Sequence, residues 1–189
     1  MPVNKKRSEP FAMNHKQRID SILRVDHAGE YAATKIYEGQ LAVFSKLPHK
    51  QGFCEKLREM EAEEHRHLGA FNELLVEREA RPSLLSPLWG AAGFALGVGT
   101  ALMGERAAMA CTAAVEEVIG THYQKQEESL AQMEGEESLR ETVDAFRQDE
   151  LEHRATALDA DAESAFGYIP LTRVIQGGCR LAIKIAEKI

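Results

Sequence analysis

The chain of 189 residues is short of cysteine, of strand-forming residues and of positive charge. Its three cysteines are far apart and form no metal-spacing motif, which suggests a reducing compartment rather than a thiolate site. The formal net charge of −7 argues against a nucleic-acid binder. Alanine, glutamate, leucine and arginine abound instead, and this composition predicts an all-α protein with a single core.

We do not expect a secretory signal peptide at the N-terminus, because no apolar stretch follows its lysines. We expect residues 1–17 to form a flexible tail and residues 18–189 to form one domain. The expected location is the cytoplasmic face of a bacterial inner membrane, with peripheral attachment. Both chain ends are more basic than acidic, which suits an anionic membrane surface and suits solvated termini equally well.

Apolar residues recur at helical spacing in segments that turn-forming residues separate. Residues 47–52 and Gly135 are expected to form turns, and Pro82 and Gly167 to stop helices. These signals predict four long helices and a shorter amphipathic one at the C-terminus. The expected ranges are about 18–46, 53–81, 105–133, 137–164 and 171–189.

Two Glu-x-x-His motifs are the most informative feature of the sequence. Each is preceded by a lone glutamate, and in both halves 34 residues separate that glutamate from the glutamate of the motif. The six residues are Glu30, Glu64, His67, Glu116, Glu150 and His153. One such motif alone would be typical of a solvated helix face, but the matched spacing is difficult to obtain by chance.

The predicted turns lie midway between the paired glutamates, so each half should be an antiparallel hairpin whose ligands lie at one height. Glutamate and histidine three residues apart share a helix face. The pattern therefore predicts a ferritin-like four-helix bundle of two pseudo-symmetric hairpins around a dinuclear iron or manganese site. Glu116, rather than Glu117, has the required spacing and shares its face with apolar residues.

Several neighbours of these six residues have two interpretations. Tyr37 and Tyr123 each follow a lone glutamate by seven residues, which indicates a place near the site or, more commonly, ordinary core packing. Asp26 is expected either to accept a hydrogen bond from a ligand histidine or to lie on the surface. His122 is expected near the cavity, and His65, which has no counterpart in the second half, is expected to be exposed.

Residues 83–104 carry no charged side chain and are long enough to span a bilayer. A span would place the two hairpins on opposite sides of the membrane, so we expect instead a crossover that runs back along the bundle. This crossover would lie in a membrane interface or against the core of the protein. The C-terminal helix, with Arg180, Lys184 and Lys188 along one face, would similarly dock on the bundle or lie on a membrane.

Four segments resemble the motifs of the demethoxyubiquinone hydroxylase family, and the similarity extends from about residue 18 to the C-terminus. They are residues 24–31 (RVDHAGEY), 67–74 (HLGAFNEL), 108–117 and 149–153 (DELEH). The resemblance implies that the six residues bind two iron ions per chain, and that O2 supplies an oxygen atom to a polyprenylated methoxy-methyl-benzoquinone in ubiquinone biosynthesis. It implies NADH or another reductant as a co-substrate, with Arg180 as a weak candidate contact for NADH.

The resemblance also implies the partners: a polyprenyl quinone, a membrane surface, and a second copy of the chain or other proteins of ubiquinone biosynthesis. One alternative is a soluble ferritin-like ferroxidase or peroxidase, which would oxidise iron without any quinone. Another is a non-enzymatic lipid-binding or scaffold protein, for which the six residues would be dispensable.

Overall fold

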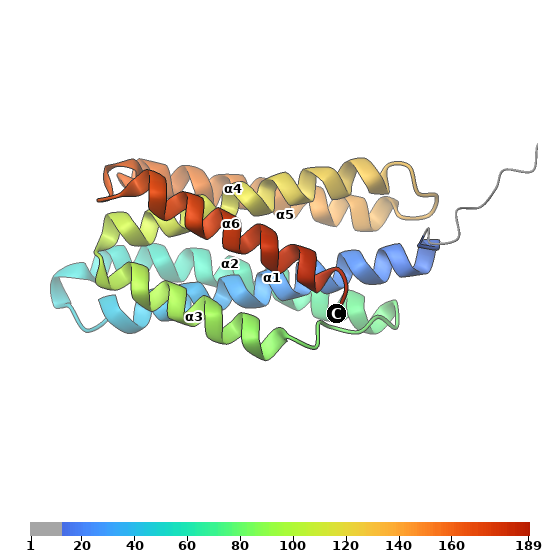
Figure 1. Cartoon of the computed structure of the whole chain (residues 1–189), viewed down its shortest axis with the longest axis horizontal. Helices are drawn as coiled ribbons and strands as arrows, with labels where there is room; N and C mark the ends of the chain where they lie inside the picture. The colour runs from blue at the N-terminus through green and yellow to red at the C-terminus, as the bar shows by residue number, and fades with distance from the viewer. Residues whose placement is uncertain (1–12) are drawn as a thin grey trace, which may run out of the picture.

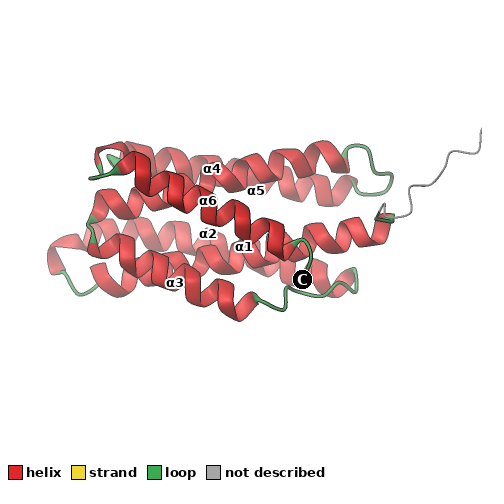
Figure 2. Ribbon diagram, viewed as in Figure 1, coloured by secondary structure: helices red, strands yellow, loops and turns green. Residues whose placement is uncertain are grey.

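The computed structural model describes residues 13–189, and within this range every regular element is helical (Figure 2). The α-helices are α1 (His15–Phe44), α2 (Gln51–Glu77), α3 (Ser86–Leu102), α4 (Glu105–Leu130), α5 (Glu137–Asp159) and α6 (Tyr168–Ala186). Two short 3-10 helices, at Pro48–Lys50 and Ala162–Ser164, lie in connections. The prediction of an all-α bundle is therefore confirmed.

Helix α1 begins earlier than the periodicity indicated because its N-terminus is capped. The Asn14 side chain accepts a hydrogen bond from the Gln17 backbone at 2.9 Å, and the Gln17 side chain accepts one from the Asn14 backbone at 3.0 Å. Such a reciprocal pair satisfies two of the free N–H groups at a helix start. Most of the predicted tail over residues 1–17 lies outside the described residues, so the division into a tail and one domain stays a prediction.

Two antiparallel hairpins form the bundle, one of α1 with α2 and the other of α4 with α5 (Figure 1). Gly135, with a φ of 83°, lies in the turn that joins α4 to α5. Within each pair the helices pack closely, whereas the backbones of the two hairpins approach each other at few points. Side chains therefore fill the space between the hairpins, and the six candidate ligands lie there.

The uncharged crossover is itself a helix, α3, and it packs along α1. A Cβ atom on Gly97 would lie 2.0 Å from the Ile36 carbonyl oxygen, and one on Gly93 would lie 2.5 Å from that of Ala32. Only glycine permits this close approach of two helices. The glycines of the crossover thus serve helix packing, and the crossover returns along the bundle as predicted.

Helices α3 and α6 both lie on the side of the bundle that faces the viewer in Figure 1. Their outer surfaces expose several large apolar side chains, namely Leu88, Phe94 and Leu102 on α3 and Ile169, Val174 and Leu181 on α6. Over the described residues, no helix combines the length and the apolar character that crossing a bilayer requires.

Candidate metal centre

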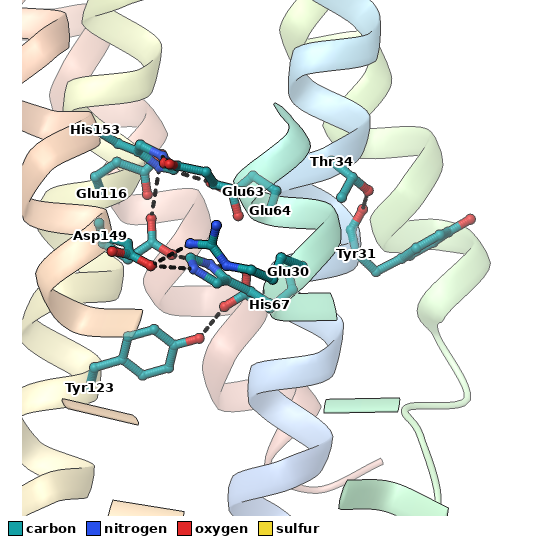
Figure 3. A network of polar contacts seen from close by, with 12 residues as sticks. Glu30, Tyr31, Thr34, Glu63, Glu64, His67, Glu116, Tyr123, Asp149 and His153 are labelled. Atoms are coloured by element: carbon teal, nitrogen blue, oxygen red, sulfur yellow. Dashed lines mark hydrogen bonds and ion pairs between the residues drawn. The ribbon is translucent and has the colours of Figure 1, made fainter. Parts of the chain in front are cut away.

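All six sequence-predicted ligands meet in the centre of the bundle, where each is no more than 3% exposed (Figure 3). Glu30 comes from α1 and Glu116 from α4, while α2 and α5 each contribute one Glu-x-x-His motif. The spacing of three residues places the glutamate and the histidine of a motif on one helix face, directed at the opposite hairpin. Glu117, the neighbour of Glu116, is exposed, so Glu116 is the one of the two that points into the bundle, as expected.

The ligand atoms divide into two overlapping groups, and in each group the atoms lie within 4.8 Å of one another. One group consists of Glu30, Glu64, His67 and Glu150, and the other of Glu64, Glu116, Glu150 and His153. The glutamates of the two motifs belong to both groups. This arrangement fits two adjacent cations with two bridging carboxylates, and with one further glutamate and one histidine for each cation.

In the described part of the chain, many of these buried ligand atoms make no hydrogen bond of good geometry, although the histidine Nδ1 atoms lie at ion-pair distance from the carboxylates. Both carboxylate oxygens of Glu64 lack a partner, as do one oxygen of Glu30, one of Glu150 and the Nδ1 atoms of both histidines. Burying unpaired carboxylates is costly unless cations compensate their charge. The mixed oxygen and nitrogen donors, without thiolate, suit iron or manganese.

The proton affinities of the site reflect this concentration of acid. Burial and the neighbouring carboxylates raise the pKa of Glu64 and of Glu116 well above the usual range. Burial opposes the charged form of His67, but the neighbouring carboxylates of Glu150 and Glu30 raise its pKa to about 11. Burial also opposes ionisation of Glu150, yet the two histidines beside it lower its pKa to about 2. Without metal, the cluster therefore holds protons that two cations would displace.

Each candidate ligand histidine also donates a hydrogen bond, from its outer Nε2–H group, to a carboxylate of the opposite hairpin. His67 Nε2 lies 3.0 Å from Asp149 Oδ2, and His153 Nε2 lies 2.7 Å from Glu63 Oε2 (Figure 3). This bond directs Nδ1 of each ring inward, where it faces the shared carboxylates. Sequence analysis missed Asp149 and Glu63, although an acid directly precedes the glutamate of both motifs.

Tyr37 and Tyr123 also connect the two hairpins, so ordinary core packing does not describe them fully. The Tyr37 hydroxyl donates to Glu116 at 3.4 Å, and the Tyr123 hydroxyl donates to Glu30. Each tyrosine thus bonds the lone glutamate of the other half. Both tyrosines are almost completely buried, so the bonds hold these carboxylates in place.

Asp26 is buried, but the expectation that it bonds a ligand histidine is wrong. Its Oδ1 accepts a hydrogen bond from Gln126 at 2.7 Å and lies 3.4 Å from Nε2 of His122. One turn before Glu30, Asp26 faces α4 rather than the helices that carry the ligand histidines. His65 is exposed, as predicted.

A cavity of about 350 Å³ reaches the candidate metal centre from the side of the bundle that α3 and α6 cover. Helices α1, α3, α4 and α6 supply its walls, and most of the lining is apolar. The ionisable side chains in the lining, apart from a cysteine, are Asp26, Glu30, His122 and Tyr123. His122 therefore does lie in the cavity wall, as predicted. Arg180 is exposed on α6 and is not part of the cavity lining. Its neighbour in the chain, Cys179, is part of the lining.

Comparison with known proteins agrees with this geometry. A family model described as ubiquinone biosynthesis protein COQ7 matches residues 17–186. The chain is 48% identical over 171 residues to a 3-demethoxyubiquinol 3-hydroxylase of Rhodospirillum rubrum, covering 90% of this chain and 78% of that protein. It is 47% identical over 176 residues to a mitochondrial NADPH-dependent 3-demethoxyubiquinone 3-hydroxylase of Mus musculus, covering 92% and 79%. A mitochondrial 5-demethoxyubiquinone hydroxylase of Saccharomyces cerevisiae is 43% identical over 185 residues, covering 90% and 78%.

Proposed function

The chain belongs to the COQ7 family of ubiquinone biosynthesis proteins, and from this premise we propose that it hydroxylates its substrate at a centre of two iron ions. It is a hydroxylase of ubiquinone biosynthesis, of the 3-demethoxyubiquinol 3-hydroxylase type. The observation that carries the proposal is the pair of overlapping ligand groups, which share Glu64 and Glu150 beside an apolar cavity.

In this proposal Glu30 and His67 would hold one ion, Glu116 and His153 would hold the other, and Glu64 and Glu150, which belong to both groups, would serve both. Bound iron would supply the chemistry that transfers one oxygen atom from O2 to the substrate ring. The bonds from Asp149 and Glu63 orient the two imidazoles, and they keep each Nδ1 available to a cation. The bonds from Tyr37 and Tyr123 hold the carboxylates of Glu116 and Glu30, which would orient them toward bound metal.

The substrate would enter the cavity head first, because the candidate metal ligand Glu30 is among the few polar side chains of the lining. A polyprenylated quinone combines an oxygenated ring with a long apolar tail, and the apolar walls suit that tail. Electrons would come from a nicotinamide nucleotide; the names of several relatives specify NADPH rather than NADH. Arg180 stays a candidate contact for it.

Anaerobic reconstitution tests the proposal directly. The purified chain is loaded with Fe(II), mixed with a short-chain demethoxyubiquinone analogue and NADPH or NADH, and exposed to ¹⁸O2. We expect the product to gain one hydroxyl group that contains ¹⁸O, as seen by mass spectrometry. Oxidation of iron without oxygen insertion, at full metal occupancy, would support a ferroxidase instead and contradict the hydroxylase assignment.

Filling the cavity mouth should block the substrate without disturbing the fold. Gly178 lines the cavity on α6, and a Cβ atom there would meet nothing within 4 Å. We expect Gly178→Leu to raise KM about tenfold or more, since the added side chain competes with substrate for the same volume. Gly177→Leu is the matched control, because Gly177 is equally unobstructed and lies outside the lining. Equal kinetics of the two variants would contradict the route.

We also propose peripheral attachment to the cytoplasmic face of a bacterial inner membrane through α3 and α6. Their exposed apolar side chains lie on the side of the bundle from which the cavity reaches the centre. The basic residues Arg173, Arg180 and Lys184 are exposed on α6 and would contact anionic head groups. A substrate with a polyprenyl tail could then pass from the lipid to the cavity.

Vesicle flotation tests this attachment. Val174 and Leu181 are 75% and 59% exposed, and they share one face of α6. We expect Val174→Glu with Leu181→Glu to lower binding to phosphatidylethanolamine–phosphatidylglycerol vesicles about tenfold or more, because two apolar contacts with lipid are replaced by charge. Val76→Glu, at a position 81% exposed on α2, should leave binding unchanged. Vesicle binding that survives the double substitution would place the membrane contact elsewhere.

A further inference from the structure

The wall of the apolar cavity contains a partly exposed polar side chain that the proposed metal centre does not use. Of the lining residues named above, Glu30 is a metal ligand and Tyr123 donates its hydroxyl to Glu30. The carboxylate of Asp26 is completely buried. His122 is different, because its side chain is 17% exposed and lines the cavity.

Two buried side chains hold the His122 ring by one edge. Nε2 of His122 lies 2.9 Å from Nε2 of Gln126 and 3.4 Å from Oδ1 of Asp26. Gln126 in turn donates to Asp26 at 2.7 Å, so the three side chains form a closed cluster. Among residues 13–189, no hydrogen bond involves the other ring nitrogen, Nδ1, and this atom is not sealed from solvent.

Such a cluster is costly in an apolar region unless its groups satisfy one another. One oxygen of Asp26 and the carbonyl oxygen of Gln126 are buried without a partner, so the cluster does not maximise stability. It does fix the imidazole of a residue that lines the cavity, with Nε2 engaged and Nδ1 left without a hydrogen bond among the described residues. The cluster is therefore arranged to present a hydrogen-bonding atom rather than to fill space.

We propose that His122 is the cavity group that hydrogen-bonds an oxygen substituent of the substrate ring, and that Asp26 and Gln126 are the positioning residues that orient it. This inference rests on the proposed function, because it concerns how that substrate is held. His122 directly precedes Tyr123, whose hydroxyl reaches Glu30. A ring oxygen bound at His122 would thus lie near the metal centre and would determine which ring edge faces it, which apolar walls alone cannot do.

The test measures binding by the full chain, loaded with Mn(II) and kept without O2. Trp89 is the only tryptophan and lines the same cavity, so its fluorescence reports occupancy. Binding of a short-chain demethoxyubiquinone analogue is measured by its quenching of this fluorescence. Binding of a phenyl compound, with the same isoprene tail but no ring oxygens, is measured by its displacement of the bound analogue. We expect His122→Phe to weaken binding of the oxygenated ring about tenfold, the loss of one hydrogen bond, and to leave the phenyl compound unaffected.

Conservative variants separate a positioning role from a structural one. His122→Asn places an amide near the position of Nδ1 and should restore most of the discrimination between the two compounds. Asp26→Asn should lower the discrimination between the two compounds about threefold, while the metal content stays at two ions. The reason is that a misdirected His122 ring loses only part of its hydrogen bond to the substrate. Asp20→Asn, on the same helix outside the cavity lining, should have no effect.

Loss of affinity for both compounds to the same extent in His122→Phe would mean that the ring only fills space, and it would overturn the inference. Equal binding of both compounds by the unmodified chain would overturn it as well, while ¹⁸O incorporation in the reconstitution left the hydroxylase assignment intact. Failure of the unmodified chain to bind either compound would contradict the inference and the proposed substrate class together.

Discussion

Glu150→Ala is expected to remove both metal ions and to lower hydroxylation about a thousandfold or more, because the metal contributes several kcal/mol to lowering the barrier. Glu150 belongs to both ligand groups, so neither ion keeps its full set without it. Glu116→Ala should instead remove one ion of the two, since Glu116 belongs to one group only. Metal content after Co(II) loading and gel filtration, measured by mass spectrometry, distinguishes the two outcomes.

The control for this comparison is Glu152→Ala. Glu152 is exposed on the same helix, two residues beyond Glu150, and should keep two ions and full activity. The alanine variants should fold, because each removes a carboxylate whose burial is costly without metal. A Glu150→Ala protein that still bound two ions would contradict the bridging role, and one that kept hydroxylating would contradict the metal centre as the site of reaction.

The melting temperature of the metal-free protein is expected to fall between pH 6 and pH 9, and metal should reverse this trend. The pKa of His67 is raised from 6.5 to about 11 and that of His153 to about 9. Their stabilisation is therefore complete below pH 6.5 and is lost as the pH rises toward those values. The raised pKa values of Glu64 and Glu116 act in the same direction, because the folded state keeps protons that the unfolded chain releases.

Ionisation of Glu150 makes the melting temperature rise with pH, but only in the acidic range. Its pKa is lowered from 4.5 to about 2, so its stabilisation is complete above pH 4.5 and is lost as the pH falls toward 2. Metal binding requires deprotonated ligands and therefore strengthens as the pH rises. At a Mn(II) concentration about a hundredfold above Kd, we expect a rise in melting temperature of about 5–10 °C. This rise should be larger at pH 8 than at pH 6.

Thermal unfolding followed by circular dichroism, with EDTA or with Mn(II) at pH 6, 7 and 8, measures both effects. Glu116→Gln is an informative control, because it removes one of the groups with a raised pKa and should flatten the pH dependence of the metal-free protein. A metal-free melting temperature that rises from pH 6 to pH 8 would show that the four carboxylates and two imidazoles do not share protons in the way their geometry indicates.

The sequence by itself determined the helical class, the two hairpins and all six candidate ligands. A three-residue spacing decides which face of a helix two side chains share, and equal distances from a turn decide their height. Both are properties of local geometry, so Glu64 and His67 could be assigned without any knowledge of packing. The acids before each motif, Glu63 and Asp149, had the same kind of signal, and comparison of the two halves would have detected them.

Only the tertiary structure decided which partner each of the remaining residues has. The tyrosine hydroxyls and the outer carboxylates bond across to the opposite hairpin, and the sequence spacing within one hairpin contains no information about the other. Asp26 lies one turn from Glu30, yet it faces α4 rather than a ligand histidine because of the way the hairpins pack. The cavity likewise exists because α3 and α6 cover one side of the bundle. Contacts between distant segments depend on how whole helices pack, and this is a property of the assembled core rather than of any local pattern.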